Sequence, residues 1–230
     1  MARLNVPRVL SLYLAWMGLT CGTLLAGIGG MLPFGLGAMG PDAAFLGLIE
    51  AELFFVTVVW PFFMPKLILP EAAAAVRTAG PGGEPHLLIL QIGVLLGVAM
   101  PLALVSRNLS QISPGEFFRA QLLVGAIACF VTVLLDRPEG SRVRSWYFLG
   151  FFVVSALFPF AGFLARETGS GGGLDFLSAV SPFWAAAQFR SDAALSWAPG
   201  AQAAVFGVLA LALLFSGAFT RRVDAAPSPK

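Results

Sequence analysis

The sequence predicts an all-α polytopic membrane protein with about six transmembrane helices and both termini in the cytoplasm. Of its 230 residues, 58% are hydrophobic and 11% are charged, against about 45–50% and about 25% in soluble domains. The 14 Lys and Arg and 12 Asp and Glu residues are too few to cover a soluble protein of this size. A net charge of +2 spread along the chain also excludes a basic nucleic-acid-binding face.

Six stretches reach the length of about 20 mainly apolar residues that a helix needs to cross a membrane. They leave short loops and no room for a separate soluble domain, so we expect residues 1–230 to form one transmembrane domain. The approximate spans are 10–32, 44–64, 87–105, 118–135, 146–164 and 201–220.

The first span follows Arg3 and Arg8 and is longer than the roughly 7–15 apolar residues of a signal peptide, so we expect it to be retained. Small residues recur along it at a spacing of four, which lets another helix approach closely. They are Gly18, Gly22, Ala26 and Gly30. This face predicts either packing within the chain or an interface between subunits.

The second span carries Glu50 and Glu52 in its outer half. Ionisable residues inside lipid are costly and are candidates for function. Because the two lie about 200° apart on a helix, they do not form a carboxylate pair on one face. Either they form an ion or proton site, or the span starts near Phe54 and both are interfacial. Pro61 and Pro65 favour a bend near the inner end of this span.

The inner connection that follows contains a short predicted helix from Pro70 to Arg77. Its early acid, Glu71, and its late base, Arg77, suit the helix dipole. Glu71 and Arg77 are therefore candidates for coupling to a partner protein. The same helix could instead lie on the membrane surface.

The third and fifth spans contain further packing and bending signals. Gly93 and Gly97 repeat the spacing of four in the third span, and Pro101 interrupts its backbone hydrogen bonds. Pro159 has the same effect near the outer end of the fifth span.

A long outer connection precedes the last span, and we expect an interfacial helix in it at about 174–190. Ser181 can cap this helix with Pro182 in the first turn. Phe183, Trp184 and Phe189 suit the headgroup boundary, where aromatic rings are favoured. The segment is therefore expected to lie in, or dip into, the outer leaflet.

The cations set the expected orientation. With the N-terminus inside, ten of the 14 Lys and Arg residues fall on the cytoplasmic side, as the positive-inside rule requires. Cys21 and Cys129 lie within the first and fourth spans, so neither is expected in an extracellular disulfide.

The sequence predicts no catalytic, cofactor-binding or metal-binding residues and no enzymatic activity. The single histidine, His86, lies at a membrane edge, so the chain alone cannot supply a bis-histidine haem or a histidine-rich metal site. No G-x-S-x-G or H-E-x-x-H sequence occurs.

The topology and the last third of the chain resemble the membrane (permease) subunit of type-2 ATP-binding-cassette transporters. The similarity covers Phe158-Pro-Phe-Ala-Gly162, Leu177-Ser-Ala-Val-Ser-Pro-Phe183 and the Arg221-Arg222 end of the last span. The resemblance implies an inner-membrane transport subunit, a separate ATPase chain and a second membrane subunit. It also implies that the first and fifth spans and the outer segment border the transport path.

Two other functions stay open from the residues. One is a non-catalytic accessory subunit of a larger membrane complex of respiratory or photosynthetic type, which the missing chemistry and the small-residue faces favour. The other is an ion or proton pathway at Glu50 and Glu52.

Overall fold

The computed structural model describes residues 5–29, 41–64, 85–136, 140–168, 180–187 and 197–224, and every regular element in these ranges is a helix. Six of the helical segments are long and apolar enough to cross a membrane. The predicted all-α polytopic membrane fold is therefore confirmed.

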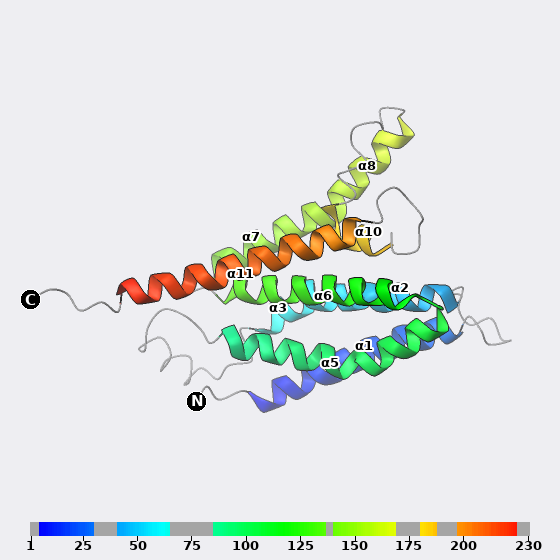
Figure 1. Cartoon of the computed structure of the whole chain (residues 1–230), viewed down its shortest axis with the longest axis horizontal. Coiled ribbons are helices and arrows are strands. Elements are labelled where there is room, and N and C mark those ends of the chain that lie inside the picture. The colour runs from blue at the N-terminus through cyan, green and yellow to red at the C-terminus, as the bar shows by residue number, and fades with distance from the viewer. Residues whose placement is uncertain are drawn as a thin grey trace, which may run out of the picture.

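Each predicted span corresponds to one helical rod (Figure 1). The first is α1 (Val6–Gly29). The second consists of α2 (Pro41–Phe54), a π-helical turn η1 (Phe55–Val59) and α3 (Trp60–Phe63). The third and fourth are α5 (Pro85–Leu109) and α6 (Pro114–Leu135). The fifth consists of α7 (Gly140–Phe152), a second π-helical turn η3 (Val153–Leu157) and α8 (Phe158–Glu167). The short helix α10 (Pro182–Ala187) precedes the last span, α11 (Ala198–Asp224).

Each of the six spans begins as a helix a few residues before its predicted apolar range, and for the fourth span a cap sets this start. The fourth span was expected from residue 118, but α6 begins at Pro114. The Ser113 hydroxyl accepts a hydrogen bond from the Glu116 N–H at 3.3 Å, and the Glu116 carboxylate accepts one from the Ser113 N–H at 3.0 Å. This reciprocal capping box starts the helix one turn before the apolar run.

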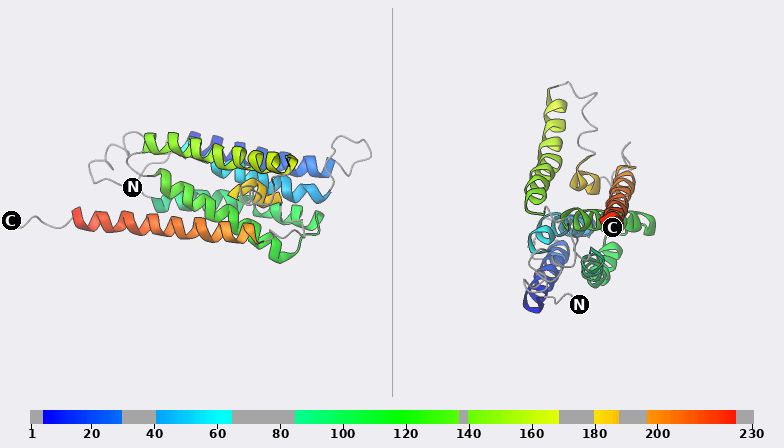
Figure 2. Two further views of the ribbon diagram at one scale, coloured as in Figure 1. Left: turned by 90° about the horizontal axis from the view of Figure 1, so that it is seen from above. Right: turned by 90° about the vertical axis from the view of Figure 1, so that its left-hand side faces the viewer.

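Most of the rods run along the long axis of the molecule, whereas α7, η3 and α8 rise obliquely away from it (Figures 1 and 2). The most extensive packing joins α6 to α11 and α1 to α2, and α5 packs against both α2 and α6. The start of α1 and the end of α11 lie at the same end of the bundle, as an even number of crossings requires.

Contacts between side chains fix the direction of neighbouring helices. The second span and α6 run parallel, because Phe45 contacts Phe117 near their starts and Trp60 bonds to Thr132 near their ends. The helices α1 and α5 also run parallel. Tyr13 bonds to Gln91, and one turn further along Trp16 bonds to Leu95.

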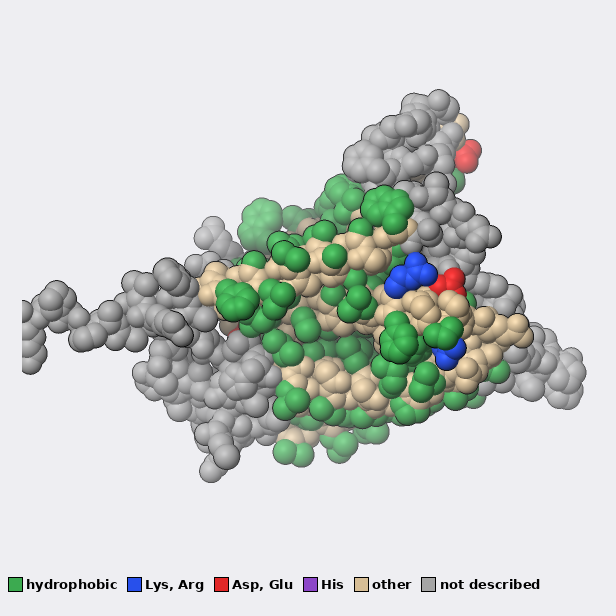
Figure 3. All heavy atoms as spheres, in the orientation of Figure 1, with side chains coloured by type: hydrophobic (Ala, Val, Ile, Leu, Met, Phe, Trp, Pro, Cys, Tyr) green, Lys and Arg blue, Asp and Glu red, His purple; other side chains and the backbone are tan. Residues whose placement is uncertain are grey.

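The second span lies at the centre of the bundle and is the most buried of the six, whereas the fifth is the least buried. Trp16, Phe45, Phe55 and Trp60 are fully buried between α1, the second span, α5 and α6. Figure 3 shows hydrophobic side chains over the middle of one face, with the described Lys, Arg, Asp and Glu side chains toward one end. This pattern suits a surface covered by lipid.

The small-residue faces of α1 and α5 point away from the other described helices of the bundle. Gly18, Gly22 and Ala26 lie on the exposed face of α1, and Gly93 and Gly97 are exposed on α5. A Cβ atom at any of these four glycines would meet nothing within 4 Å. Among the described residues, no other helix approaches this part of the stripe, because α1 meets the core with its opposite face, which carries Leu12 and Trp16. Gly30 lies outside the described residues.

Candidate functional site

A row of polar groups follows the buried second span through the centre of the bundle. Unsatisfied polar groups inside lipid cost several kcal/mol each, and here neighbouring helices supply the partners. We call this row the polar seam. It consists of Glu52, Thr57 and Trp60 on the second span, Gln121 and Thr132 on α6, and Tyr147 on α7.

The outermost pair of the seam joins Glu52 to Gln121. The Glu52 side chain is 1% exposed, and the Gln121 amide Nε2 donates to its carboxylate Oε2 at 2.9 Å. Glu50 points the other way and is exposed, as their separation around the helix predicts. The interpretation that both acids are interfacial fails for Glu52, because α2 begins at Pro41 rather than near Phe54 and its apolar window runs from Ala44 to Phe63.

The middle of the seam is a carbonyl that a proline leaves without its helical donor. In an α-helix the Thr57 carbonyl would accept from the N–H of residue 61, but Pro61 has none. The backbone widens into the π-helical turn η1, in which the Trp60 N–H donates to the Phe55 carbonyl. Tyr147, on α7, donates its hydroxyl to the Thr57 carbonyl at 2.8 Å. One tyrosine thus links the bend of the second span to the fifth span.

The innermost pair anchors the second span to α6. The Trp60 indole Nε1 donates to the Thr132 hydroxyl at 2.9 Å, and that hydroxyl donates to the Ala128 carbonyl at 2.7 Å. On the other side of the bundle, the Trp16 indole donates to the Leu95 carbonyl at 2.8 Å. The Trp16 ring also lies 4.3 Å from the Phe55 ring, centroid to centroid. The turn η1 therefore contacts α6 directly and α1 through Trp16, which α5 in turn holds by its hydrogen bond.

The fifth span repeats the π-helical turn of the second. In both, a hydroxyl residue is followed at fixed spacing by an aromatic residue, a proline and a phenylalanine. The first copy is Thr57, Trp60, Pro61 and Phe62, and the second is Ser155, Phe158, Pro159 and Phe160. Each copy has a π-helical turn ending two residues before its proline. Pro61 and Pro159 were considered separately in the sequence, and this shared spacing was therefore not detected.

The described part of the outer segment, residues 180–187, packs against the helices of the bundle. Ser181 caps α10 as predicted, accepting from the Trp184 N–H at 3.4 Å. The Gln202 amide of α11 donates to the Ser181 carbonyl at 3.3 Å. Ala185 and Ala186 are fully buried, and α10 contacts α2, η3 and α11. Of the predicted interfacial range 174–190, residues 174–179 and 188–190 lie outside the described residues.

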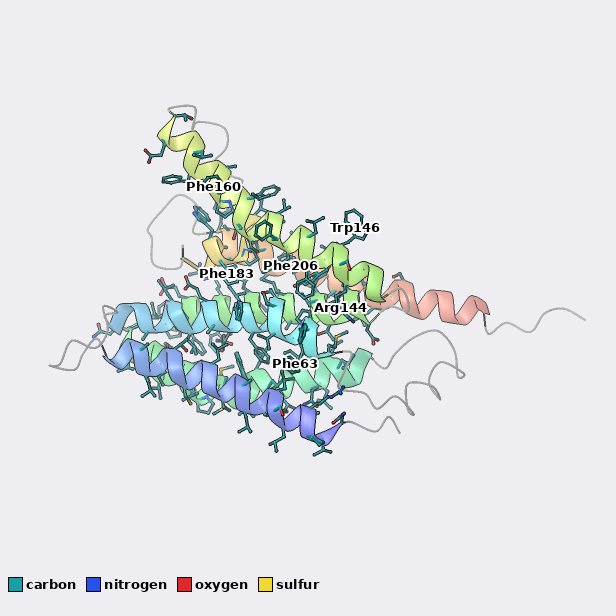
Figure 4. All side chains as sticks on the ribbon, turned by 180° about the vertical axis from the view of Figure 1, so that it is seen from behind. Phe63, Arg144, Trp146, Phe160, Phe183 and Phe206 are labelled. Carbon is teal, nitrogen blue, oxygen red and sulfur yellow. The ribbon has the colours of Figure 1, made fainter. Side chains whose placement is uncertain are left out.

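Figure 4 shows the aromatic side chains around this segment. Phe183 faces the bundle and its ring lies 6.1 Å from that of Phe151 on α7. Phe206 of α11 lies 5.3 Å from Phe130 of α6. Trp146 and Phe160, on α7 and α8, are more than half exposed. The fifth span therefore touches the rest of the bundle along a narrow strip and presents a broad apolar face outward.

The remaining candidate residues lie elsewhere. The predicted coupling residues Glu71 and Arg77 are outside the described residues. In the described ranges, no group of three or more His, Cys, Asp or Glu side chains could hold a metal ion. Cys21 and Cys129 are both free thiols. The polar seam is therefore the site that the described residues bring together.

No protein-family model, curated protein or solved structure matches this chain. The fold and the polar seam define its class as a multi-pass, all-α membrane protein with a central, polar-linked second helix.

Proposed function

We propose that the chain is the membrane-spanning permease subunit of an ATP-binding-cassette transporter in the inner (cytoplasmic) membrane. A separate ATPase chain supplies the energy, and a second membrane subunit completes the path. The observation that carries this proposal is the position of α10. After a long outer connection, the Ser181-Pro182 start of α10 lies against α2, η3 and α11 immediately before the last span, where the resembling family has its outer re-entrant segment.

Two further features support a moving rather than a static bundle. The second and fifth spans each carry a π-helical turn before a proline, and such turns are frequent at functional sites in helices. The fifth span is the least buried of the six and presents most of its apolar side chains to the outside of the bundle. In the proposed transporter this span and α1 face the second membrane subunit and the path.

The proposal is tested by affinity purification of the full-length chain from its native cells in mild detergent. An ATPase with a Walker sequence is expected at a stoichiometric level, and the purified complex is expected to hydrolyse ATP. The double variant Glu71→Ala and Arg77→Ala should lose the ATPase. Recovery of stable partners that never include an ATPase contradicts the proposal.

Arg119→Ala is the matched control for this experiment. It also removes one positive charge, from an exposed residue on the first turns of α6, on the opposite side of the membrane in the expected topology. The complex of this variant should retain the ATPase. Equal loss in both variants would mean that Glu71 and Arg77 do not form the coupling contact.

One observation favours a second candidate, an accessory subunit of a larger membrane complex. The exposed face of Gly18, Gly22 and Ala26 on α1 has no described partner within the chain. A smooth helix face of this kind suits close approach of another transmembrane helix. Co-purification with other membrane subunits and no ATPase would favour this candidate.

A further inference from the structure

Glu52 is the only ionisable side chain among the fully buried residues of the described ranges. Its backbone lies within the apolar window of the second span, and helices surround it on several sides. An ionised carboxylate in such surroundings costs far more than a neutral carboxylic acid unless a cation offsets its charge.

Among the described residues, no cation lies against the Glu52 carboxyl group to offset a negative charge. Within the part of the chain that the structure describes, the partner of the Glu52 carboxylate is the uncharged Gln121 amide. Arg107 is engaged at the turn between α5 and α6, where its Nε donates to the Ile112 carbonyl and its guanidinium lies over the Phe117 ring. Glu116 is engaged in the capping box with Ser113.

The other ionisable residues near α2 are few. Besides α6, the elements packed against α2 are α1, α5, η1 and α10, and the described parts of η1 and α10 carry no ionisable side chain. Apart from Arg107 and Glu116, the other packed helices carry six ionisable residues. They are Arg8, Tyr13 and Cys21 on α1, His86 on α5, and Arg119 and Cys129 on α6. The side chain of His86 lies outside the described ones.

Gln121 is suited to both charge states of its partner. Its amide nitrogen donates to an ionised carboxylate, and its amide oxygen accepts from a protonated one after rotation about the last side-chain bond. A glutamine can therefore hydrogen-bond to Glu52 in either charge state, although one uncharged amide does not offset the charge of the ionised carboxylate.

We propose that Glu52 and Gln121 form a proton-binding site between α2 and α6. The closed bundle holds the proton on the Glu52 carboxyl group. Release of the proton to water leaves a carboxylate that requires hydration, so the ionised state favours an arrangement in which α2 and α6 separate at this level. This site does not depend on an ATPase partner, because it is formed within one chain.

The test is infrared difference spectroscopy of the purified full-length chain in lipid nanodiscs, titrated with pH. At neutral pH the wild type is expected to show the carbonyl stretch of a protonated carboxylic acid, and Glu52→Gln is expected to lose that band. Gln121→Leu should retain the band at a higher frequency, because the hydrogen bond to the acid is gone. Absence of the band in the wild type, or its persistence in Glu52→Gln, overturns the proposal.

Two controls keep the result specific. Glu50→Gln removes the exposed acid on the opposite face of the same helix and should leave the band unchanged. Glu52→Asp retains a carboxylic acid and should shift the band, which supplies a test if Glu52→Gln does not fold. Loss of the wild-type band on adding sodium or potassium at constant pH would contradict a site selective for the proton, because the metal cation would then displace it.

Discussion

The Tyr147 hydroxyl donates to the Thr57 carbonyl at 2.8 Å across two transmembrane spans. This carbonyl is the one that Pro61 deprives of its α-helical donor. A side chain on α7 thus donates to a carbonyl for which Pro61 has no N–H to offer. The π-helical turn η1 and the fifth span are thereby linked by a direct hydrogen bond.

Tyr147→Phe should destabilise the bundle. The substitution keeps the ring and leaves the buried Thr57 carbonyl without this donor, which costs about 1–3 kcal/mol. Thermal unfolding in detergent, followed with a thiol-reactive dye that reports exposure of Cys21 and Cys129, should show a lower midpoint. Tyr13→Phe is the control, because the Tyr13 hydroxyl only accepts a longer, 3.3 Å bond from Gln91. An equal shift in both variants would contradict a special role for Tyr147.

Pro61→Ala should reduce the need for Tyr147. Alanine restores the N–H that can donate to Thr57 in an α-helical turn. Removing the Tyr147 hydroxyl should therefore cost less in the Pro61→Ala background than in the wild type, with a coupling energy of about 1 kcal/mol. The measurement is a double-mutant cycle on unfolding midpoints. Strictly additive effects would show that the proline and the tyrosine act independently.

Thr132→Val should weaken the contact between the second span and α6. It removes the hydroxyl that accepts from the Trp60 indole, and the buried indole N–H then costs about 1–3 kcal/mol. Thr23→Val is the matched control, because the Thr23 hydroxyl bonds only within its own helix, to the Thr20 carbonyl at 2.9 Å. Tryptophan fluorescence during unfolding should report an earlier transition for Thr132→Val alone.

Gly22→Leu should leave the single chain folded. A Cβ at Gly22 meets nothing within 4 Å, so the larger side chain enters lipid or a subunit interface. The unfolding midpoint should match that of the wild type, whereas Ala99→Leu, at a fully buried position of α5, should overpack the core and lower it.

The same Gly22→Leu variant tests the subunit interface. If α1 meets another subunit through this face, the complex on native gels should become smaller. An unchanged complex would show that lipid covers the stripe.

The sequence alone determined the all-α membrane fold and the six spans, because hydropathy summed over about 20 residues is a property of composition. It also placed Glu50 and Glu52 on opposite faces and predicted the Ser181 cap, since both follow from local helix geometry. The capping box at Ser113 and the repeated hydroxyl, aromatic and proline spacing are also readable in the sequence, although hydropathy does not reveal them.

Only the tertiary structure decided which helix faces meet. It buried Glu52 rather than Glu50, placed Tyr147 against Thr57 and turned Gly18 and Gly22 outward. Periodicity fixes the angle between two side chains on one helix but not the rotation of that helix within the bundle. In a chain that is apolar on nearly every face, this rotation is set by the interlocking of large side chains such as Trp16 and Phe55 and by hydrogen bonds between helices.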